Sequence, residues 1–216
     1  MGNQNFLVTR VRNDCATTYL YYWAQDSIDF AKERNFHVLE LNQDKASRVS
    51  FWSYLNKFSP ALVFLNGHGS STLITGHNNE VLLKCADDKS SLVSSIVYAL
   101  SCSACKKLGK NCVEKGVRAF IGYTSDYQFV TDSDFNTRPL LDKVAALFLE
   151  PSNLLVSALI KRNSVDEAFK RSRNMLIRNF AYSLSSKATA DQKAAAPYLW
   201  HDLKCFTYYG HPNAIV

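Results

Sequence analysis

The chain has 216 residues, of which 47% are hydrophobic and 20% are charged, and its net charge is +6. This length suits one α/β domain with a sizeable core, and the composition excludes long disordered stretches. Six cysteines scattered over such a chain do not form a disulfide-stapled miniprotein, so we expect reduced thiols. Four of them are interpreted as small core residues: Cys15, Cys85, Cys112 and Cys205.

The sequence gives no sign of a membrane segment or of a nucleic-acid partner. No apolar run is expected to span a bilayer, and the first ten residues lack the apolar core of a signal peptide. We therefore expect a cytoplasmic protein without an anchor. Most of the excess positive charge lies in residues 151–216, where a solvated helix face explains it. An acidic protein partner stays open as an alternative.

Apolar bursts alternate with helix-period stretches along the first part of the chain. Strands are predicted at residues 5–11, 36–41, 61–65, 95–100 and 118–123. Helices are predicted after the first strand, at residues 45–57 and at residues 102–115, and a small hairpin within residues 70–88. This order predicts an α/β fold, a three-layer sandwich with a doubly wound, mostly parallel sheet, as one domain over residues 1–216.

The last third of the chain reads as mainly helical. A polar loop at residues 124–137 leads into a helical region that begins at Pro139. Ser164 and Glu167 have the spacing of a capping box, which predicts that another helix begins there. A final strand is predicted at residues 205–209.

A histidine lies between two glycines where the third strand ends, in the run Asn66-Gly67-His68-Gly69. Ligands of doubly wound sheets bind beyond the carboxyl ends of the strands. Glycine permits a tight turn and a close approach of the backbone to a ligand. His68 is therefore a candidate functional residue, and the alternative is a histidine that merely caps the strand end.

A cysteine follows the next long strand, in the run Ser101-Cys102-Ser103-Ala104-Cys105. The start of the predicted helix would stabilise a thiolate at Cys102, and a nearby imidazole would accept its proton. Because His68 and Cys102 close neighbouring strands, we expect them on the same rim of the sheet as a nucleophile and its base. The alternative is two buried thiols.

The two motifs together resemble the caspase-like cysteine peptidases, which include caspases, legumains, gingipains and the bacterial CHAT peptidases. In that family one apolar strand ends in His-Gly and a second ends in Cys. Here residues 61–65 precede His68-Gly69, and residues 96–100 precede Ser101-Cys102. The stretch at residues 116–123 and the turn at residues 208–212 resemble the gingipain-like and CHAT-like branch.

The resemblance implies an endopeptidase in which Cys102 attacks the scissile carbonyl and His68 carries the proton. The N–H groups of Gly69 and Cys102 would form the oxyanion hole. It implies no metal or other cofactor, a protein or peptide substrate, and activation by self-cleavage, a regulatory partner or a homodimer. Asp14 and Asp126 would favour a basic residue, Arg or Lys, at P1. Asp14 is equally well explained as a helix N-cap, and Asp126 as a solvated loop residue.

Two other functions stay open. Cys102 and Cys105 form a C-x-x-C, which a thiol–disulfide redox protein would use. A caspase-like fold can also serve as a catalytically silent interaction module. A zinc site is not expected, because one C-x-x-C without a second pair offers too few ligands.

Overall fold

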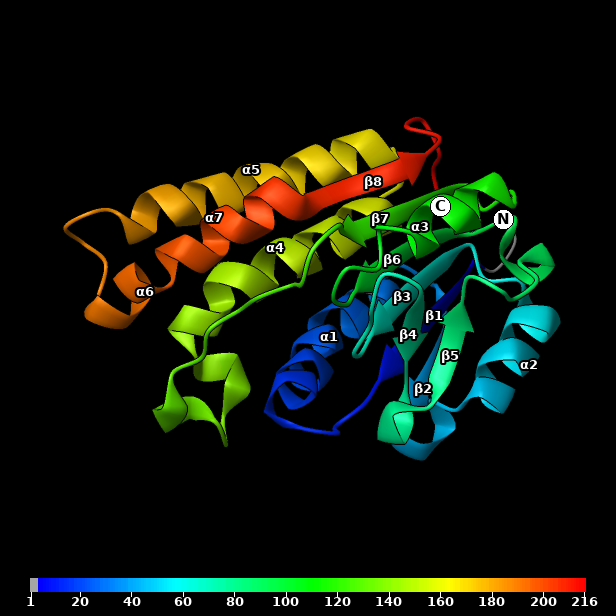
Figure 1. The fold of residues 1–216 in the computed structure, drawn as a ribbon, viewed down its shortest axis with the longest axis horizontal. Helices are drawn as coiled ribbons and strands as arrows, with labels where there is room; N and C mark the ends of the chain where they lie inside the picture. Colours follow the sequence, from blue (N-terminus) through cyan, green and yellow to red (C-terminus); the bar gives the residue numbers. More distant parts are fainter. Residues whose placement is uncertain (1–3) are drawn as a thin grey trace.

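A six-stranded sheet forms the centre of the computed structural model, which describes residues 4–216 (Figure 1). The strand order is β2-β1-β3-β6-β7-β8, and all neighbours are parallel except β7 and β8. The strands of this sheet are β1 (Asn5–Arg10), β2 (His37–Asn42), β3 (Leu62–Asn66), β6 (Ile96–Leu100), β7 (Ala119–Tyr123) and β8 (Phe206–Gly210). The predicted α/β class with a mostly parallel sheet is therefore confirmed. Residues 1–3, part of the predicted domain and of the segment expected to lack a signal peptide, lie outside the described residues.

Helices cover both faces of the sheet. They are α1 (Cys15–Glu33), α2 (Arg48–Phe58), α3 (Leu108–Glu114), α4 (Lys143–Ile160), α5 (Val165–Ser183), α6 (Ala190–Ala194) and α7 (Ala196–Cys205). One core contains buried residues of α1, α4, α5 and α7, and the other contains those of α2 and α3. The capping box of Ser164 and Glu167 starts α5 as predicted. Figure 1 shows α5 and α7 side by side, extending past the end of β8.

The strands send alternate residues into the two cores. Along β1, Phe6 and Val8 belong to the core beneath α1, whereas Leu7 belongs to the core beneath α2. Successive side chains of a strand point to opposite faces, so a strand covered on both sides is apolar throughout. This explains why the sequence shows continuous apolar runs at the central strands.

Helix α4 corrects one expectation about membranes. By length and composition Lys143–Ile160 could cross a membrane, with a mean hydropathy of 1.4. The expectation that no apolar run is long enough to span a bilayer is therefore wrong. However, 72% of this stretch is buried inside the protein, as in the core helix of a globular fold. The apolar character of α4 is thus accounted for by packing against α1 and α5.

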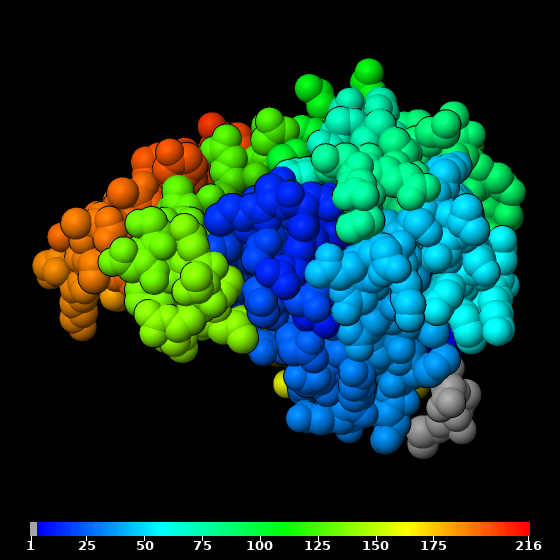
Figure 2. All heavy atoms as spheres, turned by 90° about the horizontal axis from the view of Figure 1, so that it is seen from below, coloured from blue at the N-terminus to red at the C-terminus, as the bar shows by residue number. Residues whose placement is uncertain are grey.

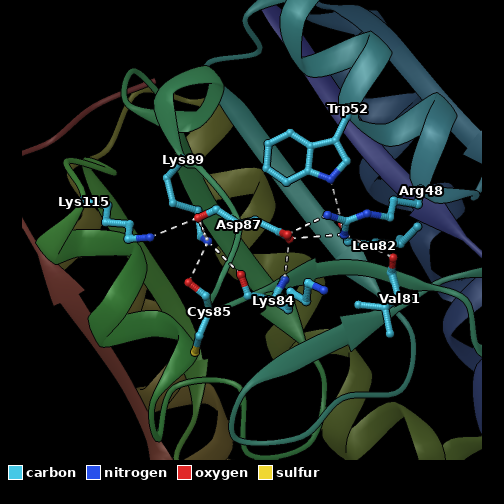
Figure 3. A network of polar contacts seen from close by, with 9 residues as sticks. All are labelled: Arg48, Trp52, Val81, Leu82, Lys84, Cys85, Asp87, Lys89 and Lys115. Carbon is cyan, nitrogen blue, oxygen red and sulfur yellow. Dashed lines mark hydrogen bonds and ion pairs between the residues drawn. The ribbon is translucent and has the colours of Figure 1, made fainter.

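The predicted hairpin consists of β4 (Leu73–Thr75) and β5 (Val81–Lys84), and a polar network anchors the loop after it (Figure 3). The Lys89 ammonium is fully buried and donates to the carbonyl oxygens of Lys84 and Asp87, at 2.7 and 2.8 Å. Arg48 of α2 forms an ion pair with Asp87. A buried ammonium held by carbonyl dipoles fixes this loop between α2 and β6.

The segment after β7 folds back along the first helix. Figure 2 shows the yellow-green part of this segment beside the blue N-terminal part of the chain. Tyr19 donates to Asp142 at 2.8 Å, and the Trp23 indole donates to the carbonyl of Pro139 at 3.0 Å. The Asp142 carboxylate also caps α4, so one buried acid joins the long loop to both helices.

Candidate active site

His68 and Cys102 follow paired strands at the same edge of the sheet. Strands β3 and β6 are parallel and in register, with Asn66 opposite Leu100. His68 and Cys102 each lie two residues beyond that pair. Parallel strands end at the same edge, so the two motifs converge there, as the sequence predicted.

The backbone of the histidine motif lies directly against the cysteine motif. A Cβ atom added to Gly69 would lie 2.9 Å from Cβ of Ser101 and 3.1 Å from the carbonyl oxygen of Cys102. A Cβ atom at Gly67 would lie 2.3 Å from the carbonyl oxygen of Thr75. The distances of 2.9 and 2.3 Å are shorter than a Cβ atom normally comes to another heavy atom. The two glycines are therefore required by close backbone packing around His68.

Two backbone donors at this edge are unused within the protein. Gly69 faces Ile74 in an antiparallel bridge. The hydrogen bonds of this bridge are made by the neighbouring residues: the N–H of Ser70 donates to Leu73, and the N–H of Thr75 donates to His68. In residues 4–216, neither the Gly69 N–H nor the Cys102 N–H donates to a protein acceptor. Free N–H groups beside a nucleophile are what an oxyanion hole needs.

Cys102 does not begin a helix, and this part of the prediction is wrong. Residues 101–107 form turns, and α3 starts at Leu108. Ser103 has a φ of 55°, and its N–H donates to the carbonyl of Ser125 at 2.9 Å. The N–H of Cys105 donates to the carbonyl of Tyr123 at 2.8 Å. These bonds to the end of β7 and to the residues just after it replace those of a first helical turn, so Cys102 does not lie at a helix N-terminus.

The Cys102 thiol is half-buried and protonated at rest. Burial raises its pKa above the ordinary value, and the nearby carboxylates of Asp126 and Asp202 add to the rise. The thiol lies 3.8 Å from the carbonyl oxygen of Tyr127, to which it donates. Formation of a thiolate therefore needs a proton acceptor at this edge.

Asp14 holds His68 from the first turn of α1. The Nε2 atom of His68 contacts Oδ2 of Asp14, while Oδ1 of Asp14 accepts from the N–H of Thr17 at 2.9 Å. Burial would raise the pKa of Asp14, but the hydrogen bonds from Thr17 and His68 outweigh it and lower the pKa. The carboxylate is thus an N-cap, as one reading of the sequence held, and also a partner of the imidazole. No sequence pattern signals this second contact, because 54 residues separate Asp14 from His68.

Asp126 lies on the loop after β7, close to the cysteine motif. Its side chain is exposed and accepts from the Ser103 hydroxyl at 2.8 Å. Its carbonyl oxygen accepts from Nε2 of His201 at 2.9 Å. The loop is thereby joined both to the cysteine motif and to α7.

The other thiols divide differently from the prediction. Cys112 and Cys205 are buried, and burial raises the pKa of each to about 12. Cys15 begins α1 and is exposed, so the core interpretation is wrong for this residue. Cys85 follows β5 and is half-buried, packed against the core beneath α2 and α3. Cys105 is fully buried, and burial raises its pKa well above the ordinary range.

Potential metal ligands gather away from His68. In the part of the chain that the structure describes, the group of His, Cys and acidic residues with close ligand atoms is His201, Asp202 and Cys205 on α7. The resemblance to caspase-like peptidases did not point to these residues.

Two solved structures share the whole architecture. Gingipain R, an Arg-specific cysteine proteinase, superimposes with a TM-score of 0.64 at 11% identity, over 98% of this chain and 47% of that chain. The complex of the pro- and mature domains of RgpB from Porphyromonas gingivalis gives 0.60 at 10% identity, over 99% and 48%. The chain thus spans about half the length of these proteins. No protein-family description and no curated protein matches the sequence.

These likenesses define the fold as caspase-like. At such low identity they say nothing of activity. The resemblance to the CHAT peptidases stays a prediction.

Proposed function

We propose that this chain is a cysteine endopeptidase in which Cys102 is the nucleophile and His68 the general base. The observation that carries the proposal is the in-register pairing of β3 and β6, which ends with His68 and Cys102 at one edge, with Gly69 packed on the Cys102 backbone. A nucleophile, a base and two free N–H groups at one edge are the parts that acyl transfer requires.

The chemistry proceeds in two halves. The Nε2 atom of His68 is engaged by Asp14, so Nδ1 is the ring nitrogen left to accept the Cys102 proton. The sulfur attacks the peptide carbonyl, and the oxyanion that forms accepts from the N–H groups of Gly69 and Cys102. His68 then protonates the leaving amine, and water cleaves the thioester. Each oxyanion donor is worth about 3 kcal/mol in such reactions.

Asp14 is a positioning residue in this mechanism. Its carboxylate fixes which ring nitrogen of His68 carries the hydrogen and favours the imidazolium that forms during attack. Because the first turn of α1 holds the carboxylate through Thr17, the orientation of His68 is tied to the fold of that helix.

We further propose a preference for Arg or Lys at P1. Asp126 is exposed beside the cysteine motif, and its negative charge contributes to the raised pKa of the Cys102 thiol. A carboxylate at this place would bind the guanidinium or ammonium of a P1 residue. Asp14 is a second acid at the same edge, although it is already engaged by His68.

The test is a panel of fluorogenic peptides that differ only at P1, with Arg, Lys, Asp and Asn. We expect turnover of the Arg and Lys peptides, at least a thousand-fold loss on Cys102→Ala, and a similar loss on His68→Ala. The matched control is Cys105→Ala, which should keep its activity. Equal turnover by Cys102→Ala would remove the peptidase proposal, and a preference for Asp would overturn the P1 assignment alone.

The environment of Cys102 argues against the redox alternative. A C-x-x-C oxidoreductase attacks through its first thiol, which must have a low pKa, whereas burial raises the pKa of Cys102. If the panel shows no turnover by the unaltered chain, a silent interaction module becomes the better reading.

A further inference from the structure

Helix α7 carries a histidine, an acid and a cysteine whose ligand atoms come together. His201 and Cys205 are four residues apart and share one face of the helix, with Asp202 beside them. One ligand atom of each of the three residues lies within 4.8 Å of the others. We propose that His201, Asp202 and Cys205 form a zinc-binding site on α7. This proposal does not depend on the peptidase activity.

The spacing of the ligand atoms is close to what zinc requires. Ligands about 2.0 to 2.3 Å from a tetrahedral zinc ion are roughly 3.3 to 3.8 Å from one another. The distances of up to 4.8 Å therefore need to close by about 1 Å. The proposal requires rotations of the three side chains to close this difference.

The histidine is already oriented as a metal ligand. The Nε2 atom of His201 donates to the carbonyl oxygen of Asp126 at 2.9 Å, which leaves the lone pair of Nδ1 free. Metal-binding histidines commonly donate their second nitrogen to a carbonyl or carboxylate, which fixes the tautomer and raises the basicity of the ligand. The same arrangement is present here before any metal binds.

The acid has one oxygen engaged and one unused. Asp202 is fully buried, and its Oδ1 atom accepts from the N–H of Gln128 at 3.1 Å. Within residues 4–216, the buried Oδ2 atom has no hydrogen-bond partner. An orphaned buried oxygen is costly, and a coordinated cation would satisfy it while the bond to Gln128 remains.

The donor set selects the metal. One imidazole nitrogen, one thiolate and one carboxylate oxygen suit zinc, whereas magnesium and calcium prefer oxygen alone. His201 is half-buried, which leaves the site open on one side for entry and for a fourth ligand from solvent. The site is separate from His68 but near Cys102. Three consecutive residues join the two: Asp126 contacts His201, Tyr127 contacts Cys102, and Gln128 contacts Asp202.

The experiment must exclude zinc held by His68 and Cys102. We would use the metal-free Cys102→Ala chain, titrate it with Zn²⁺ and with Co²⁺, and measure the metal retained after gel filtration. We expect one ion per chain, and for cobalt the near-ultraviolet charge-transfer band of a thiolate ligand. Cys205→Ser should abolish the band, and His201→Gln should weaken binding at least ten-fold. Cys15→Ser, which removes an exposed thiol outside the site, should change neither.

Three outcomes would overturn the proposal. The first is that the unaltered chain retains zinc and Cys102→Ala does not. The second is that binding persists unchanged in both Cys205→Ser and His201→Gln. The third is that no metal is retained by any form of the chain. Circular dichroism shows whether each variant is folded. If the buried Cys205→Ser change unfolds the chain, the half-exposed His201→Gln decides the result.

Discussion

Replacing Asp14 by Asn separates its two contacts. Asn caps helices nearly as well as Asp, so the free energy of unfolding should change by less than about 0.5 kcal/mol. The charged hydrogen bond to His68 is lost. Such bonds contribute about 1.5 to 3 kcal/mol, and because the side chains are 42% and 45% exposed we reduce this to about 1 kcal/mol. That corresponds to roughly a five-fold fall in kcat.

The matched control changes the cap and leaves the contact with His68 in place. The Thr17 hydroxyl accepts from the N–H of Asp14 at 3.0 Å and donates to its carboxylate at 2.8 Å. Thr17→Ala should therefore lower the free energy of unfolding by about 1 kcal/mol and keep kcat close to that of the unaltered chain. Thermal unfolding measures the first quantity, and turnover of an Arg peptide measures the second.

The kinetic parameter that changes tells the two roles of Asp14 apart. A positioning residue acts on proton transfer, so Asp14→Asn should lower kcat and leave KM nearly unchanged. A rise in KM at constant kcat would refute this reasoning and make Asp14 an S1 residue, the other role expected from the sequence. No change in either parameter would leave Asp14 as an N-cap alone.

Three further changes test other parts of the structure. Gly69→Ala should abolish turnover in a folded chain, because its Cβ would displace the Cys102 backbone. Circular dichroism shows whether the variant is folded, and full activity would contradict the close packing. Asp126→Asn should raise KM for Arg peptides and leave the alkylation rate of Cys102 by iodoacetamide within about two-fold; an unchanged KM would count against Asp126 as the S1 acid. Burial raises the pKa of Asp87, but the ion pair with Arg48, the hydrogen bond from the Lys84 N–H and the charge of Lys89 together outweigh it, so the folded pKa is lowered. These contacts stabilise the protein above a pH of about 4, and the stabilisation is lost as the pH falls through the lowered pKa. Arg48→Met should lower the free energy of unfolding at neutral pH by about 1 to 3 kcal/mol and flatten its acid dependence; equal pH curves in denaturant titrations would exclude this role.

The sheet and the edge that carries the candidate site could be predicted from the sequence. The central strands are buried on both faces, so they read as short apolar runs whose order fixes a mostly parallel sheet. Once β3 and β6 are neighbours, residues that follow each strand by the same distance must lie at one edge. The placement of His68 and Cys102 at one edge of the sheet therefore follows from local patterns alone.

Other features could not be predicted, because they depend on contacts between distant residues. Helix α3 begins six residues after Cys102, and the preceding turns donate to the carbonyl oxygens of Tyr123, at the end of β7, and of Ser125. The contact of Asp14 with His68 joins two loops that no pattern relates. The ligand group on α7 has the i, i+4 spacing of His201 and Cys205 as its only signal in sequence, and that spacing is common in helices without metal.

The turn that carries Cys102 changes how its reactivity must arise. At the start of a helix the thiol could lose its proton unaided, because the dipole stabilises the thiolate. Here burial and two nearby carboxylates oppose ionisation, so the free thiol is the resting state. In the proposed mechanism the sulfur would depend on His68 to accept its proton as the carbonyl is attacked, and the contact with Asp14 would orient His68 for this role.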